Sequence, residues 1–188
     1  MQVSKVFSAG SAALCGAFLL APTLGAAARE SSSPHEQLAA WVGHWQVRID
    51  TKETRFDHAR TDRYDARCSF LPQGTFLACD YLGMQPDPDS GRIVKDVAVL
   101  YYSQVDKTFK YTNVAREGGP REMLMHVDGN VWIRPFKIQT KSDGMLDARE
   151  VYTFVSADKQ LGRLEVSTDK GAHWIVVNEA VGIKETSP

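Results

Sequence analysis

The stretch WVGHWQVRID, residues 41–50, marks the point where the hydrophobic residues change from one periodicity to another. Just before it, SPHE at residues 33–36 provides a capping serine, a proline suited to the first helical position and a glutamate three residues after the cap. Leu38 and Trp41 follow at helical spacing. This segment therefore predicts one short helix that ends at Gly43.

After Gly43 the hydrophobic residues recur at every second position. Trp45, Val47 and Ile49 fall on one face of a predicted strand, and polar residues fall on the other. The same alternation sends His44 to the face opposite Trp45.

The rest of the sequence indicates strands, with almost no further helix. Hydrophobic runs predict strands at residues 63–70, 76–81, 93–102, 109–115, 123–127, 131–138, 145–155, 161–168 and 173–183. About ten sequential strands with short connections form an antiparallel meander that closes into an up-and-down barrel. The predicted fold class is therefore all-β, with one barrel domain over residues 33–184. Because the strand at residues 93–102 carries apolar residues on both faces, both faces are expected to be covered.

The first 28 residues have the pattern of a secretory signal peptide. A basic start precedes an apolar run from Val6 to Leu20, and small residues stand at Ala26–Ala28. This predicts export to the periplasm or the cell exterior, with a flexible mature N-terminus at residues 29–32 and a tail at 185–188. The apolar run is too short for a good membrane span, so no stable span is expected after cleavage.

Charge and composition narrow the range of partners. The formal net charge is −1 at pH 7, and no basic run stands out, so nucleic acid is not an expected partner. Hydrophobic residues make up 43% of the chain, which is enough to build a core. Oligomeric state cannot be inferred from these features.

Cys68 and Cys79 lie on either side of a predicted hairpin tip at residues 72–75. Pairing Leu71 with Phe76 places the two cysteines opposite each other at a non-hydrogen-bonded pair, with Cα atoms about 4.5 Å apart. That separation is at the short end of what a disulfide accepts. Exported proteins meet an oxidising compartment, so a disulfide is expected; two buried thiols are the alternative.

A short helix, a Gly-x-Trp motif and a long meander together resemble the lipocalin and fatty-acid-binding (calycin) superfamily. The similarity is closest to lipocalin-like bacterial domains of unknown function. Three stretches carry it: LAAWVGHWQV (38–47), CSFLPQGTFLACDY (68–81) and YTFVSADKQLGRLEVSTDKGAHWIVV (152–177).

In this resemblance Gly43 lets the backbone lie close to the barrel floor and Trp45 closes one end of the barrel. The sequence departs from lipocalins proper at two points. TDRY at residues 61–64 echoes a motif that lipocalins carry late in the barrel, but it lies too early. Lipocalins also place an arginine on the last strand above the tryptophan; in this chain Lys184 is the nearest cation that could take that place.

The interior of such a barrel either packs solid or holds one small ligand. The alternation predicts six ligand-binding side chains: Tyr64, Phe70, Tyr81, Tyr101, Tyr111 and Tyr152. Tyrosines among aliphatic residues suit an apolar or amphipathic molecule. The predicted function is therefore binding of such a molecule without catalysis. A filled barrel that binds another protein in the cell envelope is one alternative.

No cofactor or metal is predicted, because the five histidines lack metal-ligand spacing and form no cluster with cysteines. The alternative is a haem held by one axial histidine, His126 or His173. No nucleophile has a recognisable local motif. Glu150 shares a face with Tyr152 and Phe154, so an enzyme using this carboxylate inside the barrel is the second alternative function.

Overall fold

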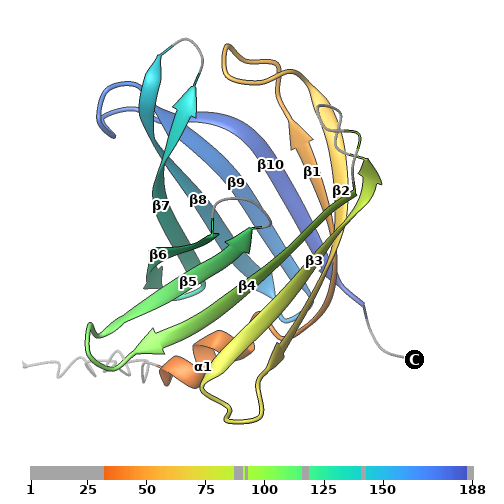
Figure 1. The fold of residues 1–188 in the computed structure, drawn as a ribbon, viewed down its shortest axis with the longest axis vertical. Helices are drawn as coiled ribbons and strands as arrows, with labels where there is room; N and C mark the ends of the chain where they lie inside the picture. Colours follow the sequence, from red (N-terminus) through yellow and green to blue (C-terminus); the bar gives the residue numbers. More distant parts are fainter. Residues whose placement is uncertain (1–31, 87–90, 92, 116–118, 141–142, 186–188) are drawn as a thin grey trace, which may run out of the picture. The chain divides into compact units, whose positions relative to one another are not determined.

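The chain forms a closed barrel of antiparallel strands with a short helix at one end (Figure 1). The computed structural model describes residues 32–86, 91, 93–115, 119–140 and 143–185. Each strand pairs with its neighbours in the sequence, and β1 pairs with β10 to complete the circle. The prediction of an all-β, up-and-down barrel is confirmed.

The strands are β1 (Gly43–Thr51), β2 (Arg60–Phe70), β3 (Phe76–Pro86), β4 (Ile93–Ser103), β5 (Thr108–Ala115), β6 (Gly119–Asp128), β7 (Val131–Thr140), β8 (Gly144–Ser156), β9 (Lys159–Ser167) and β10 (Ile175–Lys184). The predicted signal peptide and nearly all of the predicted flexible N-terminus lie outside the described residues, as does most of the tail. Among the described residues, no helix has the length and apolar character needed to cross a membrane.

The helix α1 (Pro34–Ala39) begins at the predicted cap. The Ser33 hydroxyl accepts a hydrogen bond from the Glu36 backbone N–H at 3.3 Å, and the Glu36 carboxylate accepts one from the Ser33 backbone N–H at 2.7 Å. This reciprocal pair is the capping box that the sequence predicted.

Trp45 closes the barrel at the helix end. Its side chain is 1% exposed, and its indole N–H donates to the Trp41 carbonyl at 2.8 Å. Lys184 pairs with Trp45 across β1 and β10, and its ammonium lies 4.7 Å from the centre of the indole ring. Both the burial of Trp45 and the place of Lys184 are confirmed.

The backbone beside Trp45 explains why glycine precedes it. Gly43 has φ of +131°, and a Cβ added there would lie 2.9 Å from Cδ of Lys184. A side chain at this position would strain the backbone and displace the lysine. His44 lies on the opposite face from Trp45, with its Nδ1 2.5 Å from the Glu185 carboxylate.

Aromatic side chains fill the interior behind Trp45. Trp41 is 6% exposed and meets the rings of Tyr152 and Phe154, each at 5.0 Å between centroids. Trp132 lies 5.7 Å from Trp41 and 4.9 Å from Phe109. These edge-to-face and tilted contacts make a solid plug at one end of the barrel.

The hairpin between β2 and β3 has the predicted register. The Leu71 N–H donates to the Phe76 carbonyl at 2.8 Å, and Cys68 pairs with Cys79. The two cysteines form a disulfide whose Cα atoms are 4.1 Å apart.

Replacing both cysteines with serine, Cys68→Ser with Cys79→Ser, is expected to lower the free energy of unfolding by about 2–3 kcal/mol. The reason is that the disulfide closes a loop of separation 11 and restricts the unfolded chain. Urea unfolding of the two proteins measures the difference. Dithiothreitol should destabilise the wild type and leave the double variant unchanged; a wild type that is equally stable with and without reductant would contradict the disulfide.

Two predictions about β4 are wrong. It is covered on its inner face only, where Ala98 and Leu100 are fully buried, whereas Val97 on the outer face is 39% exposed. Tyr101 lies on that outer face, where its hydroxyl donates to the Glu122 carboxylate at 2.7 Å. The apolar run has no alternation, so its sequence does not reveal which residues point inward.

Candidate functional site

The barrel encloses a cavity of about 450 Å³. Small residues line parts of its wall where larger side chains would fill it, among them Ala66 on β2, Gly162 on β9 and Ala180 on β10. Trp41 and Trp45 line its closed end. The interior is therefore hollow beyond the aromatic plug.

Four of the six predicted ligand-binding side chains line this cavity: Tyr64, Tyr81, Tyr111 and Tyr152. They come from β2, β3, β5 and β8, so their hydroxyls enter the cavity from different strands. The rings of Tyr64 and Tyr81 also contact each other at 5.8 Å between centroids. That these tyrosines bind a ligand remains a prediction.

Two of the six do not line the cavity. Tyr101 is on the outside of the barrel, on the exposed face of β4. Phe70 stacks on the His35 ring at 4.3 Å, because the end of β2 lies beneath α1. The prediction that the Phe70 side chain points inward was correct. However, α1 covers this end of the barrel, so Phe70 contacts the helix rather than the cavity.

A charged pair lies inside the cavity wall. The Arg134 guanidinium on β7 forms an ion pair with the Glu150 carboxylate, which faces it directly across β7 and β8. The Tyr152 hydroxyl donates to the same carboxylate. Arg134 is 8% exposed, and its guanidinium carbon lies 3.8 Å from the centre of the Tyr111 ring. We call Arg134, Glu150, Tyr111 and Tyr152 the inner polar cluster.

The inner polar cluster is not fully satisfied. Within the described part of the chain, the Nε and Nη1 atoms of Arg134 are buried without a hydrogen-bond partner. A buried donor that forms no hydrogen bond destabilises the protein by roughly 1–3 kcal/mol. Such groups often mark a functional site, since a ligand or an ordered water can satisfy them.

Burial sets the ionisation of the groups around the cavity. It raises the pKa of Tyr64, Tyr81 and Tyr152 above the ordinary tyrosine value, and the Glu150 charge adds to the rise for Tyr64 and Tyr152. Burial lowers the pKa of Arg134, but Glu150 and the neighbouring tyrosines outweigh it and leave that pKa raised. At neutral pH the tyrosines are therefore neutral donors beside a cationic guanidinium.

The cavity is more polar towards the end away from α1. Arg60 and Asp62 at the start of β2 line it there and form an ion pair at 2.9 Å. Asp96 on β4 also lines it and accepts a hydrogen bond from the Asn113 amide at 2.5 Å. The lining thus passes from aromatic at the closed end to polar and charged at the other, which suits an amphipathic molecule.

Glu150 and the histidines bear on the alternative functions. Glu150 does line the cavity, as predicted, but it is paired with Arg134, whereas a free acid or base inside the barrel would need it unpaired. His126 is exposed on β6, and His173 pairs with Asp169 at the surface. Neither histidine lines the cavity. Over the residues described, no three acidic, histidine or cysteine side chains form a metal-binding group.

Comparison with known proteins shows the fold and no family. No protein-family model matches this sequence, and no curated protein does. Among solved structures, the S-type phycobiliprotein lyase CPES from Guillardia theta matches with a TM-score of 0.53 and 14% identity, over 84% of this chain and 95% of that one. Rv2717c from M. tuberculosis matches with a TM-score of 0.54 and 14% identity, over 83% of this chain and 100% of that one. These similarities support the barrel fold.

Arg134 was not among the side chains predicted to line the cavity. The run VWIRPFKI, residues 131–138, has hydrophobic residues at both parities, so it does not show which way Arg134 points. A usable signal was present in the hairpin that follows. Closing the turn with Thr140 opposite Gly144 carries the register back to Arg134 opposite Glu150.

Proposed function

We propose that this protein is exported and binds a small amphipathic molecule inside its barrel, without catalysis. The observation that carries the proposal is the cavity of about 450 Å³, which is aromatic at one end and polar at the other. This volume lies in the range of small-molecule sites, about 300–1,000 Å³.

Two parts of the cavity act on different parts of the ligand. Its apolar portion is buried against Trp41, Trp45 and Tyr64, and burial stabilises the complex by about 25 cal/mol per Å² of apolar surface. Its polar portion lies at the inner polar cluster, where tyrosine hydroxyls and the guanidinium fix its orientation. Because Arg134 and Glu150 neutralise each other, a polar group that accepts hydrogen bonds suits this cluster without requiring a full charge.

Export is supported by two independent features. The N-terminal sequence has the pattern of a signal peptide. The Cys68–Cys79 disulfide is typical of proteins that fold in an oxidising compartment.

Filling the cavity tests the proposal. Ala180→Phe, on the inner face of β10, is expected to weaken binding of the fluorescent amphipathic anion 1-anilinonaphthalene-8-sulfonate by about tenfold or more, because the new ring occupies the space for the dye. Val181→Phe, on the next residue and 40% exposed outside the barrel, is the matched control. Fluorescence titration of the folded proteins gives the three dissociation constants.

The two variants separate interior binding from adsorption to the surface. We expect Val181→Phe to bind the dye as the wild type does. Equal affinity in Ala180→Phe and the wild type would contradict a site inside the barrel, and so would a wild type that does not bind the dye at all.

A further inference from the structure

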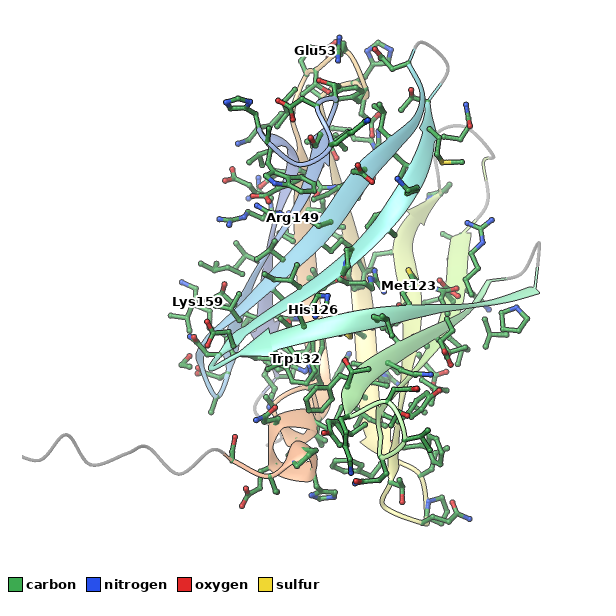
Figure 2. All side chains as sticks on the ribbon, turned by 90° about the vertical axis from the view of Figure 1, so that its left-hand side faces the viewer. Glu53, Met123, His126, Trp132, Arg149 and Lys159 are labelled. Carbon is green, nitrogen blue, oxygen red and sulfur yellow. A yellow bond between two sulfur atoms is a disulfide. The ribbon has the colours of Figure 1, made fainter. Side chains whose placement is uncertain are left out.

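The barrel wall is open on one side, between β6 and β7. These neighbours pair only where His126–Asp128 meets Val131–Ile133, although β6 extends back to Gly119 and β7 extends on to Thr140. Figure 2 shows β6 turning away from β7 beyond this short ladder, with Met123 on the diverging part. Along the rest of the barrel, neighbouring strands pair over six or more residues (β5 with β4 or β6, for example).

Pro135 explains where the pairing stops. The Phe154 N–H donates to the Asn130 carbonyl at 3.0 Å, so the backbone of Asn130 faces β8. Along an antiparallel strand, the backbone N–H and C=O groups of successive residues point to alternate neighbouring strands. The backbone groups of Trp132 therefore point towards β8, whereas those of Ile133 and Pro135 point towards β6. Proline has no N–H to donate, so the ladder lacks the donor that its next hydrogen bond to β6 would need, two residues beyond the last pair at Ile133.

The opening leads to the cavity. The hollow between β6 and β7 is bordered by Met123 and Leu124 on one side and by Pro135 and Phe136 on the other. At its inner edge it shares four lining residues with the cavity: Asp96, Asn113, Arg134 and Glu150. The Arg134–Glu150 ion pair thus stands where the side opening meets the interior.

The rim of this opening is itself amphipathic. Leu124 is 47% exposed, and Met123 is a flexible side chain that can adapt to different shapes. Glu122 and Lys137 add opposite charges on the two strands. A second polypeptide is a poor occupant, because Pro135 removes a donor that an added strand would need from the β7 edge.

We propose that the opening between β6 and β7 is a side entrance through which the ligand reaches the cavity, with its polar end held at Arg134 and Glu150. The inference rests on the proposed function, since it concerns the route of the same small amphipathic molecule. It predicts that the width of this opening controls the rates of binding and release more than the affinity.

Closing the opening tests the proposal. Pro135→Val restores the backbone N–H that faces β6 and favours extension of the ladder towards Leu124. We expect stopped-flow association and dissociation of 1-anilinonaphthalene-8-sulfonate to slow by about fivefold or more, with the dissociation constant changed by less than about threefold. Pro120→Val, an exposed proline on β6 that pairs with β5, is the matched control and should leave both rates unchanged.

A second test does not depend on the strands moving. The predicted mature chain has no free cysteine, because its two cysteines, Cys68 and Cys79, are joined. In that chain Leu124→Cys is labelled with a bulky maleimide to obstruct the opening, and Leu161→Cys, 41% exposed on the outer face of β9, is labelled as the control. Labelled Leu124→Cys should bind and release the dye more slowly than labelled Leu161→Cys. If the wild type binds the dye but neither Pro135→Val nor labelled Leu124→Cys slows it, the side entrance is wrong and the proposed function stands. A wild type that does not bind the dye overturns both.

Discussion

Replacing Arg134 with methionine is expected to lower the free energy of unfolding by about 2–4 kcal/mol. The variant leaves the Glu150 carboxylate facing the barrel interior without its cation. The expected loss lies below that of a fully buried pair because the Glu150 side chain is 26% exposed to the cavity. Urea unfolding followed by tryptophan fluorescence measures it.

The double variant Arg134→Met with Glu150→Gln distinguishes two contributions to this loss. One is the lost attraction between Arg134 and Glu150, and the other is the burial of an unpaired Glu150 carboxylate. Removing both charges should restore much of the stability that Arg134→Met loses, since the remaining amide is neutral and can accept from Tyr152. If Arg134→Met costs less than about 1 kcal/mol, or the double variant is no more stable than the single one, the inner polar cluster does not contain a buried ion pair between Arg134 and Glu150.

Replacing Trp45 with alanine is expected to lower the free energy of unfolding by about 3–5 kcal/mol. The indole is 1% exposed, donates to the Trp41 carbonyl and lies beneath the Lys184 ammonium, so the change removes packing, one hydrogen bond and a cation–π contact. It also leaves a cavity at the closed end of the barrel. Thermal and urea unfolding both report the loss.

Two variants define what Trp45 contributes. Trp45→Phe keeps a ring beneath Lys184 but loses the hydrogen bond, and it should fall between the wild type and Trp45→Ala. Ile183→Ala changes a residue on the outer face of β10, which pairs with β1, and this residue is 48% exposed. It should lower the free energy of unfolding by less than about 1 kcal/mol. A Trp45→Ala protein as stable as Ile183→Ala would show that Trp45 does not close the barrel.

Much of the fold was predictable because local chemistry and tertiary structure agree at particular residues. The capping box at Ser33, the change of period at Gly43 and the hairpin that brings Cys68 to Cys79 each follow from short-range rules. Alternation then placed Trp45 inside and His44 outside. It also placed Tyr64, Tyr81, Tyr111 and Tyr152 towards the cavity that they line.

Prediction was wrong or incomplete where alternation is absent or where distant elements decide the outcome. On β4, apolar residues at successive positions do not show which side chains point into the barrel. Tyr101 was therefore assigned to the wrong face. Phe70 points inward, but α1 covers it, which depends on how the helix lies over β2. The cavity and its opening depend on how far β6 and β7 separate, a property of the closed barrel rather than of either strand.

A barrel that holds a small amphipathic molecule in its cavity should retain that molecule when the protein is purified. Native mass spectrometry tests it on wild type and Ala180→Phe purified in parallel from the organism that encodes the protein. We expect the wild type to carry an additional small-molecule mass that is absent from, or much reduced in, Ala180→Phe. Two proteins that both show only the mass of the polypeptide, or that retain the same additional mass to the same extent, would contradict it.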